Sequence, residues 1–360
     1  GRKSKMINNK SIKYTLAPQA KFYDSMGADW KPFVMFNHFP NIRSKYCNTD
    51  IFGLRFNNLE EEFNKIAIFD EKINPNKKKA ILIGNSTAFG EGSTCDQKTI
   101  SNYLTQKSDY HFFNFCGRGF SGYQEIVNFL LLSNRIKNLE RIVIVSGLND
   151  SYLPYYVKNF ENNQVPIFGY NSFSKTMKNY SKGWKNKILK IFLGKFFKEE
   201  KNWDKVNSLN WYSELFENKK PLIDIKNKIH PEDHLKEITD RNFMLWSTIA
   251  KGMKIKIDFI LQPVGSWCDK KKTKEENDLY KEENNSNELQ RIYQYVDKAK
   301  YTLLKEILIR NSEKYNINFS DCNEIFNRNS FDSEWLFLSR FHITDLANKY
   351  IAEAIIKNIL

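Results

Sequence analysis

The sequence predicts an α/β fold: a three-layer α/β/α sandwich around a parallel five-stranded sheet of the flavodoxin-like kind. Short apolar runs recur along the chain, and amphipathic helical patterns separate them. Such alternation is typical of parallel sheets whose right-handed crossovers place helices on both faces. The chain has 360 residues, 41% of them hydrophobic, which is enough apolar material for such a core.

Five apolar runs are predicted to form the strands of this sheet, and most of them end in a glycine or a polar residue. They cover residues 79–84, 111–115, 141–147, 254–261 and 317–321. The third run is the clearest, because it contains four β-branched residues in succession, and the fifth is the weakest.

Helical periodicity is found between these runs. The predicted helices cover residues 97–106, 123–136, 235–253, 288–315 and 345–359. In the second of them Ile126, Val127, Leu130 and Leu131 recur at helical spacing. Every predicted strand is therefore preceded or followed by a helix that can form part of a crossover.

Three stretches fall outside this rhythm. Residues 1–78 are predicted to be an irregular N-terminal extension that packs on an α/β/α domain of residues 79–360, and residues 151–233 form an insertion in that domain. Within the insertion, about 184–198 predicts an amphipathic helix that covers the core or the cleft, with membrane-surface contact as the alternative. Residues 268–287 are highly charged and predict a solvated loop, with contact to an anionic substrate as the alternative.

The charge balance of +14 favours anionic partners such as an acidic glycan, although a low-GC genome produces the same lysine-rich composition. The lysines are dispersed and no nucleic-acid-binding motif occurs, so nucleic acid is not expected as a partner. The five cysteines are widely spaced and form no CxxC pair, which argues against a disulfide framework and a zinc site.

No targeting or membrane-spanning segment is expected. Residues 1–10 are basic and polar, without the apolar region of a signal peptide, and no run of about 18 apolar residues occurs. The expected compartment is the cytoplasm, or the periplasm or a membrane surface if an upstream anchor has been removed. The sequence gives no oligomeric state.

The turn after the first predicted strand is the strongest candidate for chemistry. Residues 84–92 place Ser86 directly after a buried strand, between glycines. Its hydroxyl would lie at the carboxyl edge of the sheet, and its backbone N–H would face an oxyanion formed on it. A phosphate-binding turn and a simple helix N-cap are the alternatives. Neither a Walker A loop nor a GxGxxG dinucleotide motif is present.

Three further motifs follow predicted strands or precede the last helix. Asn114 to Gly119 follows the second strand, Gly147-Leu-Asn149-Asp150 follows the third, and His342 stands just before the last helix. Ligands of such sheets bind at the carboxyl ends of the strands, so these residues are expected to converge with Ser86.

These four motifs, in this order, resemble those of the SGNH hydrolases, the GDSL-like esterase and acyltransferase superfamily. Residues 48–55 and 261–263 also resemble members from polysaccharide gene clusters. The resemblance implies Ser86 as nucleophile, His342 as general base, and the backbone of Ser86 and Gly119 with the Asn149 amide as oxyanion hole. It implies a serine esterase that acts on an O-acylated carbohydrate, with O-acetyl favoured, and no metal or organic cofactor.

Three positions depart from the family pattern. Asn85 replaces an aspartate, Cys116 replaces a glycine, and Ser339 stands where the family has the acid of its Asp-x-x-His motif. A triad acid fixes the tautomer of the imidazole and stabilises the imidazolium. Ser339, Asp332 and Asp345 are the candidates for orienting His342.

The sequence leaves two rival functions open. The first is an O-acetyltransferase of surface polysaccharide that uses the same Ser86 and His342. The second is a non-catalytic carbohydrate-binding or assembly protein that keeps the fold, which Ser339 in place of the acid favours.

Overall fold

The computed structural model describes residues 11–57, 68–69, 76–156, 166–168 and 230–360. Its centre is a five-stranded sheet in the order β4-β3-β5-β6-β7, in which every neighbouring pair is parallel. The strands are β3 (Lys78–Gly84), β4 (Tyr110–Asn114), β5 (Leu139–Ser146), β6 (Lys256–Leu261) and β7 (Asn318–Asp321). This is the flavodoxin-like order, and the predicted fold class is confirmed.

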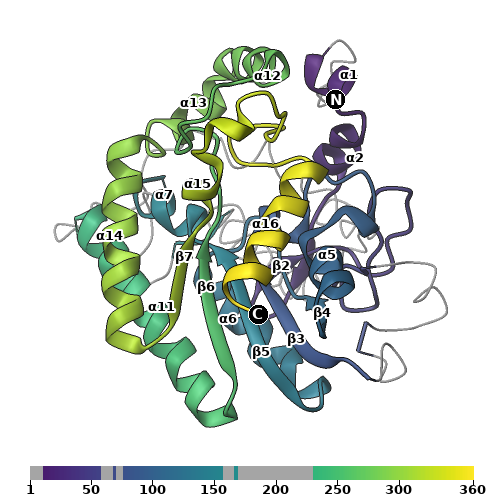
Figure 1. Cartoon of the computed structure of the whole chain (residues 1–360), viewed down its shortest axis with the longest axis vertical. Coiled ribbons are helices and arrows are strands. Elements are labelled where there is room, and N and C mark those ends of the chain that lie inside the picture. The colour runs from purple at the N-terminus through teal and green to yellow at the C-terminus, as the bar shows by residue number, and fades with distance from the viewer. Residues whose placement is uncertain (1–10, 58–67, 70–75, 157–165, 169–229) are drawn as a thin grey trace, which may run out of the picture.

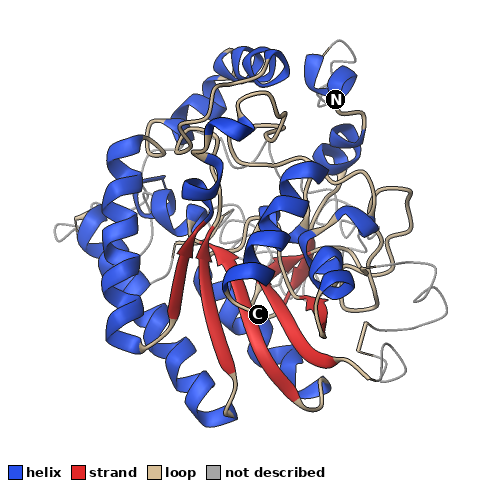
Figure 2. Cartoon of the chain, viewed as in Figure 1, coloured by secondary structure: helices blue, strands red, loops and turns tan. Residues whose placement is uncertain are grey.

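Helices cover both faces of the sheet (Figures 1 and 2). Ile81 and Ile83 of β3 face a core shared with α6 (Gly122–Leu132), α11 (Pro231–Met253) and α14 (Lys298–Tyr315). Ala80 and Leu82 face a second core shared with α5 (Ile100–Lys107) and α16 (Asp345–Asn358). Neighbouring residues of one strand thus alternate between two buried faces, which explains why the strand is apolar throughout.

The remaining described elements lie mainly at the carboxyl edge of the sheet. They are α4 (Ser86–Phe89), α7 (Leu148–Tyr156), α12 (Lys274–Asn284), α13 (Asn287–Tyr293), α15 (Cys322–Phe326) and three 3₁₀ turns (Asp96–Lys98, Ser133–Arg135 and Asn329–Phe331). The N-terminal segment of the chain contains α1 (Ile12–Leu16), α2 (Gln19–Ser25) and an antiparallel hairpin of β1 (Asp29–Lys31) and β2 (Met35–Asn37).

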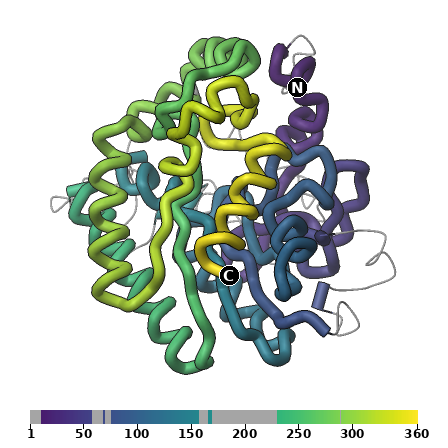
Figure 3. Tube along the Cα trace, in the orientation of Figure 1, coloured from purple at the N-terminus to yellow at the C-terminus, as the bar shows by residue number. Residues whose placement is uncertain are grey.

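The N-terminal segment is bonded to the edge where the strands end. Arg55 is fully buried, pairs with Asp96 at 2.8 Å, and donates to the carbonyl groups of Phe89 and Gly90 in the turn after β3. The backbone N–H of Lys13 in α1 donates to Glu282 of α12 at 3.0 Å, so these distant segments lie side by side (Figure 3). Segments from both ends of the chain therefore surround the carboxyl edge.

The structure corrects two element predictions. Residues 268–287 are not a loop throughout: they contain α12, which begins with a capping box in which Thr273 and Glu276 satisfy each other's backbone N–H. The single helix expected over residues 288–315 is two helices, α13 and α14, because Asp297 caps the second by accepting from the N–H of Lys300. The helix expected over 184–198, like most of the insertion, lies outside the described residues.

Within the described ranges, no helix combines the length and the apolar character that crossing a bilayer requires.

Candidate active site

Ser86 is the first residue of α4, at the carboxyl end of β3. The turn begins at Gly84, where a Cβ would lie 2.1 Å from the carbonyl oxygen of Val145, so only glycine fits. The N-cap of α4 is Asn85, whose side chain accepts from the N–H of Thr87 at 3.2 Å. The alternative reading of Ser86 as an N-cap is therefore wrong, and its hydroxyl is available for other contacts.

His342 meets Ser86 although 256 residues separate them in the chain. Its Nε2 lies 3.0 Å from Ser86 Oγ. The residues before it form a tight loop, in which the carbonyl of His342 accepts from the N–H of Leu338 at 2.9 Å. Arg340 anchors this loop: its guanidinium lies 4.2 Å from the ring centre of Tyr293 and donates to Asn284. The imidazole is thus held against the Ser86 hydroxyl by a loop that is fixed by hydrogen bonds and by the contacts of Arg340.

Ser339 is the side chain at the other ring nitrogen. Its Oγ lies 3.3 Å from Nδ1 of His342 and accepts from the backbone N–H groups of Phe341 (3.1 Å) and His342 (2.9 Å). A hydroxyl oxygen has two lone pairs, and these two N–H groups occupy both. Its own O–H is then left to donate to Nδ1, which places the ring proton on Nε2.

Glu91 is the carboxylate beside the imidazole, and the sequence analysis missed it. Its Oε2 lies 3.5 Å from Nε2 of His342, on the side that faces Ser86. Arg118 holds the same carboxylate with two bonds, Nε to Oε2 at 2.9 Å and Nη2 to Oε1 at 3.2 Å. The only sequence signal was its place in the turn after β3, five residues beyond Ser86.

Arg118 connects three segments around this cluster. Its guanidinium donates to the carbonyl groups of Met26 and Tyr23, each at 2.8 Å, and its backbone N–H donates to Nε2 of His38 at 3.2 Å. His38 Nδ1 in turn donates to the carbonyl of Gly53 at 3.1 Å, because that oxygen only accepts. The residue before Gly119 is therefore fixed by both its backbone and its side chain.

Burial and neighbouring charges set the protonation of these groups. Burial opposes ionisation of Glu91, but Arg118 and then His342 outweigh it and lower the pKa of Glu91 to about 2. Burial lowers the pKa of His342 below its usual value; Glu91 and Asp24 raise it, and Lys13 and Arg118 lower it. At pH 7 the site therefore contains a fixed carboxylate beside a neutral imidazole.

Of the expected oxyanion residues, Gly119 lies in the buried loop after β4, and Asn149 is buried in the first turn of α7, which follows β5. Gly119 has a φ of 75°, in the left-handed region that favours glycine. Asn149 begins α7 next to Leu148; its Nδ2 donates to the carbonyl of Phe120 at 2.7 Å, and its Oδ1 accepts from Tyr152. One of the two N–H bonds of the Asn149 amide is thus used to fix the loop that contains Gly119.

A second polar network, also missed in the sequence, supports the turn from below. Asn85 Nδ2 donates to Gln262 Oε1, Gln262 Nε2 donates to Thr87 Oγ1 at 2.9 Å, and Thr87 Oγ1 donates to the carbonyl of Phe341 at 2.9 Å. Asn85, which replaces the family's aspartate, thereby links Ser86 to the residue before His342. The network ties the nucleophile turn, the end of β6 and the histidine loop together.

Other candidate residues have structural contacts. Asp345 accepts from Thr94, through both the backbone N–H and the hydroxyl, and Asp332 accepts from the N–H of Lys271 at 2.8 Å. Of the three candidates for orienting His342, Ser339 is therefore the one bonded to the ring, and the structure corrects the inclusion of Asp332 and Asp345. Asn114 donates to Ser101, and Cys116 packs in the second core.

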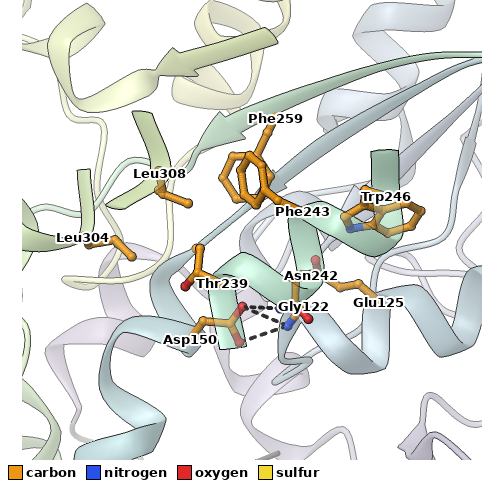
Figure 4. Close-up of a pocket in the computed structure, with 11 residues that line it drawn as sticks. Gly122, Glu125, Asp150, Thr239, Asn242, Phe243, Trp246, Phe259, Leu304 and Leu308 are labelled. Carbon is orange, nitrogen blue, oxygen red and sulfur yellow. Dashed lines mark hydrogen bonds between the residues drawn. The ribbon is translucent and has the colours of Figure 1, made fainter. Parts of the chain in front are cut away.

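A small cavity of about 10 Å³, the size of one water molecule, lies between α6, α7, α11 and α14 (Figure 4). Two carboxyl groups line it, the buried Glu125 and the partly exposed Asp150. Asp150 accepts from the N–H of Gly122 at the start of α6 and from Asn242 of α11, and Glu125 accepts from Ser146. Burial raises the pKa of Asp150 to about 6 and that of Glu125 well above its usual value.

Over the described part of the chain, no group of three or more His, Cys, Asp or Glu side chains is arranged to hold a metal ion.

Comparisons with known proteins return distant structural likenesses. No protein-family model and no curated protein matches the chain. Among solved structures, a carbohydrate acetylesterase from Sinorhizobium meliloti is 9% identical, with a TM-score of 0.43, over 79% of this chain and 98% of that one. The aryl esterase of M. smegmatis is 10% identical, with a TM-score of 0.41, over 78% and 98%. An acetyl xylan esterase is 11% identical, with a TM-score of 0.38, over 78% and 100%.

These likenesses are too distant to add to the fold described above, a parallel sheet in the order β4-β3-β5-β6-β7 with helices on both faces. The chain has the parallel sheet in the order expected, and the motif residues follow β3, β4 and β5 or precede α16.

Proposed function

We propose that the chain is a serine esterase that cleaves O-acyl esters of a carbohydrate, chiefly O-acetyl esters. The observation that carries the proposal is the contact of 3.0 Å between Ser86 Oγ and His342 Nε2. A nucleophile within hydrogen-bond reach of a neutral imidazole is the arrangement that acyl transfer requires.

In the proposed reaction His342 Nε2 takes the proton of Ser86 Oγ while the oxygen attacks the ester carbonyl. The tetrahedral intermediate collapses as the imidazolium gives this proton to the leaving sugar hydroxyl, and an acyl-enzyme remains. Water then attacks the acyl group, His342 again takes and returns a proton, and the free acid leaves.

The oxyanion donors in this proposal are the backbone N–H groups of Ser86 and Gly119 and the second N–H of the Asn149 amide. Support comes from the geometry of Asn149: its bond to the carbonyl of Phe120 fixes the amide plane and leaves one donor unused. Preorganised donors of this kind each contribute about 10²–10³ in rate.

The general-base step needs the imidazole with its proton on Nδ1, the opposite of the resting tautomer inferred from Ser339. An exchange of tautomer must therefore precede attack, and it leaves Nδ1–H facing an oxygen whose lone pairs are occupied. This lowers the fraction of competent enzyme but does not remove the base. The carbohydrate part of the proposal rests on the resemblance of residues 48–55 and 261–263 to polysaccharide-cluster proteins.

The test is release of acetate from a peracetylated sugar and from p-nitrophenyl acetate. Wild type is compared with Ser86→Ala, His342→Gln and, as matched control, the exposed Ser25→Ala. We expect the first two to lose about 10³-fold or more and the control to keep the full rate. Equal rates for wild type and Ser86→Ala would overturn the proposal.

A second candidate function, binding of a carbohydrate without catalysis, is favoured by one observation. The atom at Nδ1 of His342 is a hydroxyl oxygen of Ser339 rather than a carboxylate. A chain that binds an acetylated glycan in calorimetry but turns over no ester would have this function. Addition of a deacetylated glycan as acceptor separates hydrolysis from transfer, since a transferase makes acetylated acceptor in place of acetate.

A further inference from the structure

The acid missing at position 339 leaves the imidazolium of the proposed reaction without a carboxylate at Nδ1. A carboxylate is nonetheless present in the site, at the other ring nitrogen. Glu91 Oε2 lies 3.5 Å from His342 Nε2, the atom that receives the proton of Ser86. Both side chains are nearly buried, with 7% of Glu91 and 14% of His342 exposed, so solvent screens their interaction only weakly.

The position of this carboxylate is fixed from two directions. The N–H of Glu91 donates to the carbonyl of Ser86 at 2.9 Å, which places its backbone directly after the nucleophile turn. The two bonds from Arg118 then fix the plane of the carboxylate and keep it ionised. Because Arg118 is itself bonded to Tyr23, Met26 and His38, its guanidinium has little freedom to swing towards the ring.

We propose that Glu91 takes the place of the absent triad acid and acts on His342 from the Nε2 side, with Arg118 as the residue that positions it. The inference rests on the proposed esterase function. When the proton of Ser86 Oγ moves to Nε2, the new N–H bond has the carboxylate of Glu91 as a neighbour. The imidazolium is stabilised by this fixed charge until it gives the same proton to the leaving sugar oxygen, and Glu91 is never protonated in the cycle.

The position of Glu91 beside Nε2, rather than Nδ1, determines its effect on His342. A triad acid at Nδ1 selects the tautomer as well as stabilising the charge. Glu91 attracts a proton to Nε2 instead, so it stabilises the imidazolium but does not favour the base-competent neutral form. The site therefore keeps, through Glu91, one of the two tasks that one aspartate performs in the family pattern, whereas Ser339 favours the opposite tautomer and does not supply the other.

Several other charges face His342 and must be counted in its titration. Asp24 acts in the same direction as Glu91, whereas Lys13 and Arg118 oppose it. Lys13 is paired with Asp24 at 2.7 Å, so these two largely cancel. Removal of the charge of Glu91 takes a negative charge away from His342 and also leaves Arg118 without its counter-charge. Both effects lower the pKa of His342 and favour its neutral ring.

The experiment is a double-mutant cycle of Glu91→Gln and Ser339→Asp, with kcat and the pH profile of kcat/KM on p-nitrophenyl acetate as readouts. We expect Glu91→Gln to lose about 10- to 100-fold in kcat and to shift the acid limb of the profile to lower pH. Ser339→Asp returns a carboxylate to Nδ1, and we expect its gain to be at least about tenfold larger in the Glu91→Gln background than in the wild-type background.

The matched control is Asp258→Asn, which breaks a buried pair with Arg141 (2.7 Å) inside the sheet. It costs stability in the same manner but should leave the acid limb in place. If Glu91→Gln does not fold, Glu91→Asp keeps the charge and withdraws it from the ring, and we expect a smaller loss of kcat.

The outcomes separate the two levels of the proposal. The role of Glu91 would be overturned if Glu91→Gln or Glu91→Asp folds and has the wild-type rate. It would also be overturned if Ser339→Asp gives the same gain in both backgrounds. In either case Ser86→Ala would still abolish turnover, and the esterase proposal would stand. A wild type no faster than Ser86→Ala would remove the esterase itself.

Discussion

At the scale of single residues, the orientation of His342 depends on how many side-chain oxygen atoms the residue at position 339 has. A carboxylate has one oxygen for the backbone N–H groups of the loop and another for the ring, whereas Ser339 must serve both with one. The sequence predicted the meeting of Ser86 and His342, because the motifs follow strands whose carboxyl ends share one edge of the sheet and because their order resembles that of the SGNH hydrolases. It did not predict Glu91, since a glutamate between two glycines gives no sign of the direction in which it points.

Ser339→Asp in the otherwise wild-type chain should raise kcat by about tenfold. The second oxygen would accept the Nδ1–H bond and favour the tautomer that takes a proton at Nε2. Steady-state kinetics on p-nitrophenyl acetate measure the change, with Asp332→Asn as a control expected to have no effect. A folded Ser339→Asp that is no faster would show that the tautomer does not limit the rate.

The acid limb of kcat/KM should lie below pH 6.5. Burial lowers the pKa of His342, so the neutral base persists below the usual range and is lost only as the pH falls through its lowered pKa. A profile from pH 4 to 9 in constant ionic strength measures this limb. A limb above pH 7 would mean that the carboxylates beside the ring dominate over its burial.

At the scale of elements, the carboxyl edge is held by helix starts that bond to one another. Asp150 in the first turn of α7 accepts from the first N–H of α6 and from Asn242 of α11. The sequence predicted strands to within about two residues because most of them, β3, β5 and β6 above all, are buried on both faces. It missed α12, whose charged surface hides the buried Leu279 and Tyr280, although the Thr273-x-x-Glu276 capping box was readable.

Asp150→Asn should stabilise the protein at neutral pH. The pKa of Asp150 is raised from 3.8 to about 6, so the folded state holds its proton more tightly and loses stability as the pH rises from about 4 to 6. A shift of this size corresponds to about 3 kcal/mol above pH 6. Asparagine still accepts from Gly122 and carries no charge.

Urea unfolding of both chains at pH 4 and pH 7.5 tests this prediction. The advantage of Asp150→Asn should be present at pH 7.5 and nearly absent at pH 4. An advantage of equal size at both values would assign the effect to packing rather than to ionisation.

At the scale of the whole molecule, the N-terminal segment belongs to the site. Tyr23, Met26 and His38 together hold Arg118, and Arg55 holds the turn after β3. The sequence showed these residues only as an aromatic-rich stretch, because their bonds go to backbone groups distant in the chain. Two cations whose charges act on His342 are paired, Arg118 with Glu91 and Lys13 with Asp24.

His38→Phe should destabilise the chain by about 2–4 kcal/mol at pH 7.5. The new ring keeps the stacking on Phe89, whose centre lies 3.9 Å away, but leaves the N–H of Arg118 and the carbonyl of Gly53 without partners. The pKa of His38 is lowered to about 3, so the wild type loses stability as the pH falls below about 6.5, and this loss should be absent in His38→Phe.

Chemical unfolding between pH 4 and 8 measures both effects, and the exposed His230→Phe serves as control. If His38→Phe is as stable as the wild type at pH 7.5, the N-terminal segment does not support Arg118 through His38.

The wide separation of Ser86 from His342 along the chain has a consequence for biosynthesis. A ribosome completes the hydroxyl-bearing turn 256 residues before it adds the imidazole, and domains begin to fold from the N-terminal side during translation. Under the proposed esterase mechanism, the nascent polypeptide is thus inert towards esters until His342, which follows all five strands of the sheet in the chain, has been added and docked. The appearance of turnover in a cell-free translation reaction would then report the docking of the histidine loop.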